Sequence, residues 1–235
     1  MFSAKILAYG AALSLVMSTS AYAASSKHYD VSRPELMPGL SVQLDLPIDK
    51  NGERWKKILN NSKTTIAEFL HTSATLAAVD IEVKEVEAFF DTDTLKLSPS
   101  DPKFIHSPEV IQQLKQRYSQ FKQAGDDASR TLTSFKKTQV SGKAALRFQV
   151  QSQYFNDSAA MRVISQADYL AFMHDNRYVY VKMADEAFYQ KGAEKALPLP
   201  FPKSVPAFYD YKSSMNSIKL KYSGLAATNK RPVNV

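Results

Sequence analysis

The 235-residue chain contains no cysteine. This absence excludes cysteine nucleophiles, thiolate metal sites, thiol redox chemistry and a lipid-modified cysteine anchor. It also excludes disulfides, on which small secreted folds without a sufficient core depend. The sequence therefore predicts a domain that is stabilised by an ordinary hydrophobic core.

Histidine and glycine are scarce, with four and seven residues. The histidines are isolated, so no pair has the i, i+4 spacing of a helical zinc site, and the dispersed glycines form no phosphate-binding loop. No serine lies in a G-x-S-x-G motif, and Ser134-Phe-Lys-Lys137 matches S-x-x-K without the companion motifs of a penicillin-recognising site. We therefore predict no catalytic residue, no metal ligand and no cofactor.

Long apolar runs are absent beyond the N-terminus. Lys5 precedes an apolar run over residues 6–17, which is shorter than the roughly 20 residues that span a bilayer. Small residues follow in an A-x-A pattern at Ala21 and Ala23. This layout predicts a signal peptide that is cleaved between Ala23 and Ala24, and the alternative is a retained membrane anchor.

The predicted signal peptide, residues 1–23, assigns the protein to the outside of a bacterial cytoplasm. The remainder of the chain has no second apolar stretch that approaches spanning length. We therefore expect a periplasmic or secreted bacterial protein without a stable membrane span.

The formal net charge is +7, from 30 Lys and Arg against 23 Asp and Glu. Basic residues form no run longer than two, so the sequence predicts no nucleic-acid partner. Carboxylates gather in one stretch, and Lys84 is the single cation among them. Its acidic members are Asp80, Glu82, Glu85, Glu87, Asp91 and Asp93. A solvated face explains this acidic stretch, and the alternative is a polarised surface that attracts an anionic partner away from the acidic residues. A glycosidase pair is not predicted, because it needs two carboxyls that face each other across a cleft.

The chain has twelve tyrosines and thirteen phenylalanines. Tyrosine buries its ring while its hydroxyl stays wet, so it is favoured at recognition surfaces. Tyr154, Tyr178, Tyr180 and Tyr189 crowd the C-terminal half. We expect most tyrosines in the core and a minority in an exposed patch for a protein, peptide or glycan partner. The acidic stretch and these tyrosines are the two features that would form such a patch together.

The N-terminal half of the mature chain yields mixed secondary-structure signals. Residues 24–40 carry prolines without periodicity and are predicted as an extended leader. Alternation over residues 41–46 predicts a half-buried strand. A helical stripe from Trp55 to Leu70 predicts an amphipathic helix with Trp55 in the core. Residues 79–91 fit either element, and we favour a strand with a register change near Glu85.

The C-terminal half predicts a helix and then a meander. Ser107-Pro-Glu109 has the residues of a helix N-terminus. Residues 132–185 alternate with turn residues between them, which predicts antiparallel neighbours. Residues 197–206 hold four prolines and are predicted as a stiff connector to a last helix from Phe208 to Ile218. The tail, 223–235, is predicted as disordered and basic.

These elements predict an α+β fold. We expect one domain over residues 41–222, in which a single antiparallel sheet, with its meander in residues 132–185, packs against amphipathic helices. The sequence contains no internal repeat and no long linker that would divide it.

Three segments of the C-terminal half carry a family resemblance. They are Val140-Ser-Gly-Lys-Ala-Ala-Leu146, Asp175-Asn-Arg-Tyr-Val-Tyr-Val181, and the predicted helix Phe208 to Leu220 with its Met215-Asn-Ser-Ile-Lys219 ending. Their order resembles the PsbP/Mog1/DcrB-like group of small α+β domains. The resemblance implies an antiparallel sheet covered by helices and a non-catalytic accessory, assembly or chaperone-like role.

Together these features predict an exported soluble binding or accessory protein with a protein or peptide partner in the cell envelope. The alternatives are an envelope hydrolase whose site is assembled only in three dimensions, and a periplasmic inhibitor or immunity protein. The sequence leaves the partner and the oligomeric state open.

Overall fold

The structure is a computed structural model that describes residues 26–48, 55–58, 62–72, 76–119, 128–157, 160–190, 192, 195–202 and 211–223. The predicted signal peptide, its cleavage site and residues 224–235 of the predicted tail lie outside these residues. Across the described ranges, no helix is long and apolar enough to cross a membrane.

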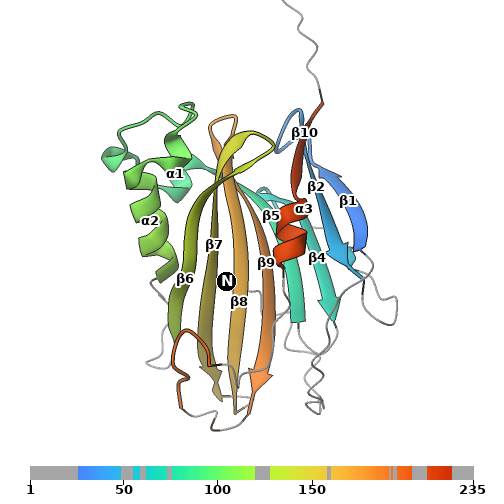
Figure 1. Ribbon diagram of the computed structural model, residues 1–235, viewed down its shortest axis with the longest axis vertical. Coiled ribbons are helices and arrows are strands. Elements are labelled where there is room, and N and C mark those ends of the chain that lie inside the picture. The colour runs from blue at the N-terminus through green and yellow to red at the C-terminus, as the bar shows by residue number, and fades with distance from the viewer. Residues whose placement is uncertain are drawn as a thin grey trace, which may run out of the picture.

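Two antiparallel sheets form the molecule (Figure 1). The larger has seven strands in the order β3-β4-β5-β9-β8-β7-β6, and the smaller has three in the order β1-β2-β10. The strands of the larger sheet are β3 (Lys56–Ile58), β4 (Thr65–Thr72), β5 (Leu76–Glu85), β6 (Ser129–Val140), β7 (Lys143–Asn156), β8 (Met161–His174) and β9 (Arg177–Tyr189). Those of the smaller are β1 (Ser26–Ser32), β2 (Leu40–Pro47) and β10 (Lys219–Tyr222).

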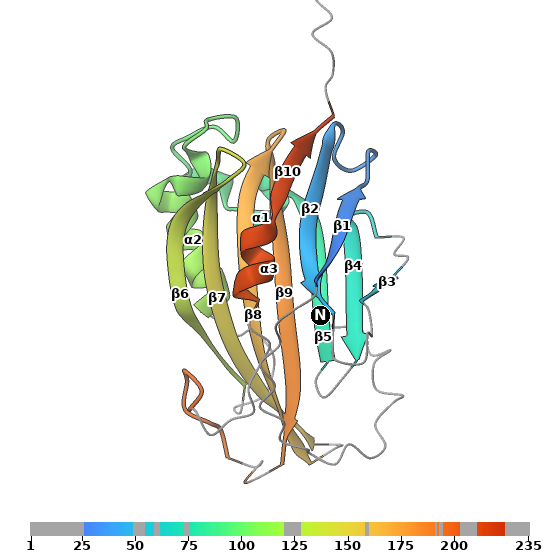
Figure 2. The same ribbon diagram turned by 45° about the vertical axis from the view of Figure 1, so that its right-hand side comes forward.

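The smaller sheet and the short helix α3 (Lys212–Ser217) pack on one face of the larger sheet, which we call the first face (Figure 2). Helices α1 (Val86–Phe89) and α2 (Pro108–Ser119) pack on the opposite, second face, together with the 3₁₀ turn η3 (Phe104–His106). A second 3₁₀ turn, η2 (Thr92–Thr94), lies between α1 and η3 in the sequence. The seven-stranded sheet therefore forms the middle layer of the fold.

The two faces have separate hydrophobic cores because side chains alternate along a strand. In β9, Val179, Val181 and Met183 belong to the core of the first face. Tyr178 and Tyr180, between them in the sequence, belong to the core of the second face. A central strand of this sheet is consequently buried on both sides, at least near the helices.

The structure contradicts the predicted fold class. An α+β domain with a single sheet packed against amphipathic helices was expected, whereas the described chain is mostly β-structure in two sheets. Helices α1, α2 and α3 are four, twelve and six residues long, so the smaller sheet provides much of the packing that helices were expected to provide.

The predicted helix from Trp55 to Leu70 is wrong, because this stretch contains β3 and β4. Ala67, Phe69 and His71 are buried in alternation, as a strand requires. A register shift between Thr65 and Ala67 disturbs the period of two, so the apolar positions also matched helical spacing. The core position of Trp55 is confirmed, since 5% of the residue is exposed.

Two further segments differ from the prediction. The strand expected over residues 79–91 is present as β5, but at Val86 the chain enters α1 instead of shifting register. The last helix is limited to Lys212–Ser217 among the described residues, and Leu220 then lies in β10. Residues 26–32, inside the predicted leader, form β1 and pair with β2.

The remaining elements follow the sequence patterns. The strand predicted over residues 41–46 is β2, and the helix predicted after Ser107 is α2, where the Ser107 hydroxyl accepts a hydrogen bond from the amide of Val110 at 3.4 Å. The predicted meander is formed by β6 to β9. Residues 197–202 of the predicted connector have no helix or strand, and residues 203–206 lie outside the described part.

Candidate functional site

The acidic stretch and the tyrosines meet on the second face of the larger sheet. The backbone register pairs Asp80 of β5 with Lys182 of β9, and Lys182 with Tyr169 of β8. Two residues along, Glu82 pairs with Tyr180. Directly paired residues share a face, so these side chains form adjacent rows. We call the polar patch the set Asp80, Glu82, Lys84, Tyr169, Tyr180, Lys182 and Glu186.

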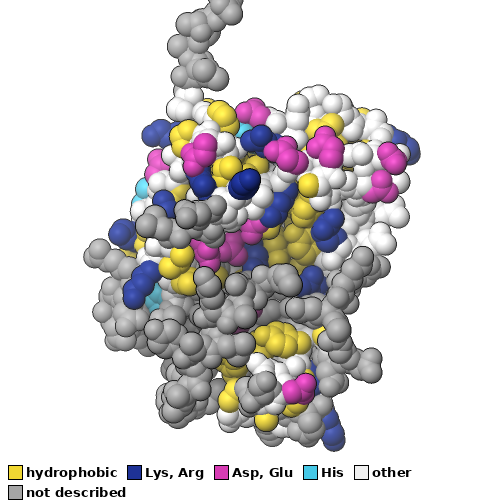
Figure 3. Space-filling view, turned by 180° about the vertical axis from the view of Figure 1, so that it is seen from behind, with side chains coloured by type: hydrophobic (Ala, Val, Ile, Leu, Met, Phe, Trp, Pro, Cys, Tyr) yellow, Lys and Arg dark blue, Asp and Glu magenta, His cyan; other side chains and the backbone are white. Residues whose placement is uncertain are grey.

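Figure 3 views this second face and shows acidic and basic side chains together near its middle, beside a hollow with hydrophobic side chains. Glu85, Glu87, Asp91 and Asp93 of the acidic stretch are exposed on and around α1 and η2 and do not belong to the patch. Among the acidic members of the stretch, half-buried charge is therefore limited to Asp80 and Glu82 in β5, whereas Glu85 at the end of that strand is exposed.

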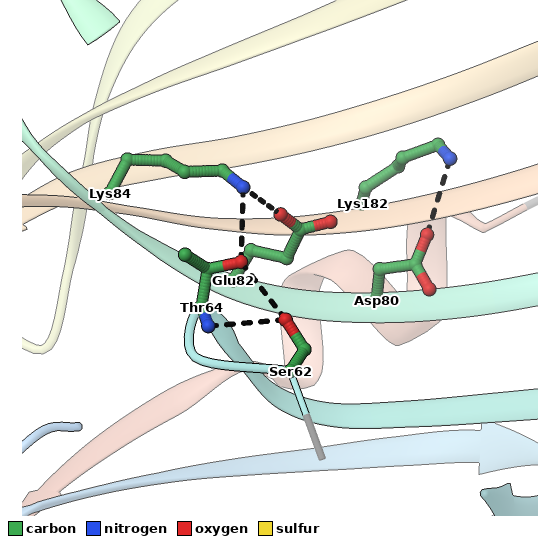
Figure 4. A network of polar contacts seen from close by, with 6 residues as sticks. All are labelled: Ser62, Thr64, Asp80, Glu82, Lys84 and Lys182. Carbon is green, nitrogen blue, oxygen red and sulfur yellow. Dashed lines mark hydrogen bonds and ion pairs between the residues drawn. The ribbon is translucent and has the colours of Figure 1, made fainter. Parts of the chain in front are cut away.

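An ion pair joins the centres of two neighbouring strands (Figure 4). Lys182 Nζ lies 3.2 Å from Asp80 Oδ2, and each side chain is only 14% exposed. Burial raises the pKa of the Asp80 carboxyl, and the Lys182 ammonium opposes this effect without cancelling it. The nearby carboxylates Glu82 and Glu68 raise it further.

The pKa of the Lys182 ammonium is raised, as expected for a cation among acidic groups. Burial alone would lower the pKa of its ammonium, but Tyr169, Asp80 and Glu186 together raise it above the ordinary lysine value. Lys182 is therefore charged at neutral pH and holds three hydrogen-bond donors on the patch.

The two phenols of the patch are neutral donors. Burial raises the pKa of Tyr180, and the negative charge of Glu82 adds to the effect. Burial also raises the pKa of Tyr169, against the opposing charges of Lys182 and Arg130. Both hydroxyls keep their protons at physiological pH, so the patch combines donors with carboxylate acceptors.

A second set of contacts lies beside the ion pair (Figure 4). Lys84 Nζ is 2.5 Å from Glu82 Oε2 and donates to Thr64 Oγ1 at 3.3 Å. The Thr64 hydroxyl lies 3.2 Å from Ser62 Oγ. Because the Lys84 ammonium is engaged by Glu82 and donates to the hydroxyl, this arrangement is a hydrogen-bond network and not a nucleophile with its base.

Glu186 is the outlying member of the patch. It lies four residues beyond Lys182 on the same strand and therefore on the same face. Between them, Ala184 pairs with Ala78 on one side and Ala167 on the other, so the sheet has a row of small side chains here. Burial raises the pKa of the Glu186 carboxyl, with Lys182 opposing it.

The described histidines lie away from the patch. His28 pairs with Asp45 at 2.8 Å, and His71 packs against the Trp55 ring with centroids 5.3 Å apart. His106 Nε2 lies 2.7 Å from the Ala145 carbonyl oxygen, and His174 is at the β8–β9 hairpin. Among the described residues, no three carboxylate, histidine or cysteine groups are placed to hold a metal ion.

The four tyrosines named in the sequence analysis lie in different parts of the structure. Tyr180 lies on the patch and is 9% exposed, whereas Tyr178 is fully buried and stacks on Phe89 with centroids 4.4 Å apart. Tyr154 is 39% exposed on β7. Tyr189 packs against Ile164 in a small separate cluster.

Sequence analysis missed Lys182 and Glu186. Both are charged residues in β9, which is otherwise rich in valine, alanine and aromatic residues. Lys182 and Glu186, which are four residues apart and therefore on one face of a strand within a predicted meander, were the available signal, because such a strand is normally covered on its faces.

No protein-family model matches the chain, and no curated protein matches its sequence. Among solved structures, it is similar to the crystal structure of LpqN involved in cell envelope biogenesis of Mycobacterium tuberculosis. The two chains are 11% identical with a TM-score of 0.36, over 83% of this chain and 91% of that chain. At this TM-score, the similarity assigns neither a fold nor a function to the present protein.

Proposed function

We propose that the protein is an exported, non-catalytic accessory protein that binds a protein or peptide partner of the bacterial cell envelope through the polar patch. The observation that carries this proposal is the Asp80–Lys182 ion pair within charged rows on the second face of the sheet. The signal-peptide pattern at Ala21 and Ala23 supports export to the periplasm or the medium.

The ion pair supports a binding role because a buried ion pair contributes little to the stability of a sheet. Removing two charges from water costs free energy that their mutual attraction often fails to repay, and apolar side chains of similar volume serve at least as well. The neighbouring Ala78, Ala167 and Ala184 show that this sheet face accepts apolar residues. Charges retained there are consistent with a ligand that uses them.

The donor and acceptor inventory favours recognition over hydrolysis. Lys182, Tyr169 and Tyr180 donate hydrogen bonds, and the patch carboxylates accept them. Hydrolysis by a serine would require an adjacent base, and the described histidines lie elsewhere. A partner that presents both amide and charged groups, such as a peptide segment, matches this inventory.

Site-specific photo-crosslinking in the producing cells tests the proposal. A photoreactive phenylalanine analogue is placed at Tyr154, on the second face, and in a control chain at Tyr222, which is 43% exposed on the smaller sheet. We expect one discrete envelope partner to be captured from position 154 and not from position 222. Equal labelling from both positions, or none from either, would overturn the proposal.

A variant connects the captured partner to the patch. The double substitution Asp80→Asn with Lys182→Met removes both charges of the pair together, so neither partner is left as a lone buried ion. We expect it to lose the cross-link at position 154 while its circular dichroism spectrum stays that of the wild type. A fully retained cross-link would show that the partner does not bind through the ion pair. Protein sequencing of the exported chain checks the signal peptide, for which Ala24 is the expected first residue.

A further inference from the structure

Two exposed aromatic side chains lie in one row, on either side of Val163, at the far end of the second face. Tyr154 of β7 pairs with Val163 of β8, and Val163 pairs with Phe188 of β9, so the three side chains form one row. Tyr154 and Phe188 are each 39% exposed. In the described part of the chain they are two of only three exposed large hydrophobic side chains, and the third, Tyr222, is on the other sheet.

The next row toward the polar patch contains a carboxylate. Glu186 pairs with Ser165, and Ser165 with Ser152, whose hydroxyl lies 2.7 Å from that of Ser165. The two serines thus bond to each other. Burial raises the pKa of the Tyr154 phenol, and the negative charge of Glu186 raises it further.

Glu186 lacks a close cation among the residues that the structure describes. Its carboxylate has no hydrogen bond and no ion pair within 4 Å there, while Lys182, the nearest cation on its strand, is held by Asp80 at 3.2 Å. Among the described residues, this largely buried carboxylate therefore has no direct counter-ion, and it lies one row from Phe188 on its own strand and Tyr154 on β7.

We propose that Glu186, Tyr154 and Phe188 form a subsite for a cationic group, the ammonium of a lysine or the guanidinium of an arginine in the partner segment. A carboxylate supplies the charge-assisted hydrogen bond, and the faces of aromatic rings attract the cation through their quadrupoles. The alkyl stem of the same side chain packs on the rings. This inference rests on the proposed function and names its partner chemistry.

The local charge balance supports a cation in spite of the formal net charge of +7. Two titratable groups shift the pKa of Glu186: Lys182 lowers it and Asp80 raises it. Glu186 in turn raises the pKa of Tyr154. Burial raises the pKa of Glu186, and a bound cation would lower it again. Binding should therefore weaken as the pH falls through the raised pKa, because protonation removes the charge that holds the ligand.

Nuclear magnetic resonance titration of the mature protein tests the subsite. The probes are two capped glycine–serine peptides of equal length, one with a central lysine and one with norleucine, together with butylammonium as the free amine. We expect the lysine peptide to shift the amide signals of Tyr154, Ser165 and Phe188. The norleucine peptide should bind at least about fivefold more weakly, as expected for the loss of a cation–aromatic contact.

Substitution of the carboxylate provides the decisive comparison. Glu186→Gln should weaken binding of the lysine peptide at least about fivefold, whereas Glu87→Gln, which removes an exposed carboxylate on α1, should leave it unchanged. Equal affinities of the lysine and norleucine peptides, or an unaltered affinity in Glu186→Gln, would overturn the subsite. Butylammonium mimics the lysine side chain and should shift the same signals only at higher concentration, and an affinity equal to that of the lysine peptide would overturn the peptide assignment.

The two proposals fail in different ways. If the envelope partner is still captured from position 154 in the Glu186→Gln protein at wild-type yield, the proposed function stands and the cation subsite is wrong. If no partner is captured from position 154 in the wild-type protein, the proposed function fails whatever the peptides show.

Discussion

Asp80 and Lys182 are direct cross-strand partners, and their 3.2 Å contact joins residues that lie 102 positions apart in the sequence. Each charge is mostly removed from water, so each depends on the other. The two partners nevertheless differ in how they can respond to the loss of the pair. Burial raises the pKa of Asp80, which allows it to accept a proton, whereas Lys182 has a raised pKa and keeps its charge.

We therefore predict unequal costs for the two single substitutions. Asp80→Asn leaves a buried ammonium and should lower the free energy of unfolding by about 1–3 kcal/mol, the cost of an unsatisfied buried polar group. Lys182→Met should cost less, because the remaining carboxyl can neutralise itself. Urea denaturation, followed by Trp55 fluorescence, measures both values. Equal costs, or a larger cost for Lys182→Met, would contradict this interpretation.

Glu186→Gln should stabilise the protein near neutral pH. The pKa of Glu186 is raised in the folded state, so the folded protein holds this proton to a higher pH than the unfolded chain does, and ionisation opposes folding above that pKa. The gain, less than about 1 kcal/mol as for most single changes near the surface, should fade as the pH falls and the wild-type carboxyl becomes neutral. Urea denaturation across this pH range, with Glu87→Gln as an unchanged control, checks the sign.

A substitution that stabilises the fold and weakens binding would separate function from structure. A carboxylate that serves only the fold should destabilise it when removed. Glu186 is predicted to do the opposite, because functional sites often retain groups that cost stability. A loss of stability in Glu186→Gln would assign the residue to the fold and remove the argument for a ligand.

The meander could be predicted from sequence because its signals are local. Ser141 and Gly142, with φ of 47° and 80°, and Asp175 and Asn176, with φ of 47° and 61°, occupy the left-handed region that such residues tolerate in tight turns. Alternation in the flanking strands then determines which residues share a face. Helix α2 could also be predicted from the sequence, because Ser107 marks its start.

The segments that were predicted wrongly depend on distant partners. Thr65 and Ile66 are β-branched and favour a strand, but the shift between Thr65 and Ala67 hid the period of two. The smaller sheet brings β10 against β2, and four-residue strands carry too little pattern to be recognised alone. The resemblance to the PsbP/Mog1/DcrB-like group stays a prediction, although the α+β class that it implied is contradicted.

Only part of the candidate site could be predicted from the sequence. The sequence points to the acidic stretch and the tyrosines as the features that would form one surface, and Asp80 and Tyr180 do share a face of the sheet. Lys182 was treated as a strand residue because no local pattern indicates which distant strand will lie opposite. Pairing of β5 with β9 supplies that information, and it comes from the packing of the whole sheet.

Trp55→Phe should destabilise the protein without affecting the patch. The indole Nε1 donates to the Pro47 carbonyl oxygen at 3.1 Å, and the ring packs in the core of the first face. Loss of the hydrogen bond and of ring volume should cost about 1–3 kcal/mol. Thermal unfolding measured by circular dichroism gives the cost. Retained crosslinking from position 154 would support a core role, whereas a loss of crosslinking at unchanged stability would indicate a ligand platform.

His174 connects the two sheets through a buried side chain that contacts the smaller sheet and its first loop. Its side chain is 7% exposed at the end of β8, with Nε2 3.4 Å from the Pro38 carbonyl oxygen and 3.2 Å from Asp175 Oδ2. Its ring also lies near Tyr222 of β10, with centroids 6.0 Å apart. Burial lowers the pKa of His174, Asp175 and the Pro38 carbonyl oppose this, and Lys143 and Arg177 add to the lowering.

The lowered pKa of His174 predicts that acid weakens the stability of the protein through this residue. A histidine whose folded-state pKa lies below its unfolded value near 6.5 binds protons more readily when unfolded, so its contribution to stability is present above that value and is lost as the pH falls. His174→Gln keeps a donor for Pro38 and cannot be protonated, so it should reduce the fall in melting temperature between about pH 7 and about pH 5. His28→Gln removes an exposed histidine of the smaller sheet and is the control for the loss of a histidine as such. If both variants lose melting temperature on acidification as steeply as the wild type, the acid sensitivity arises elsewhere in the protein and the junction at His174 is not its source.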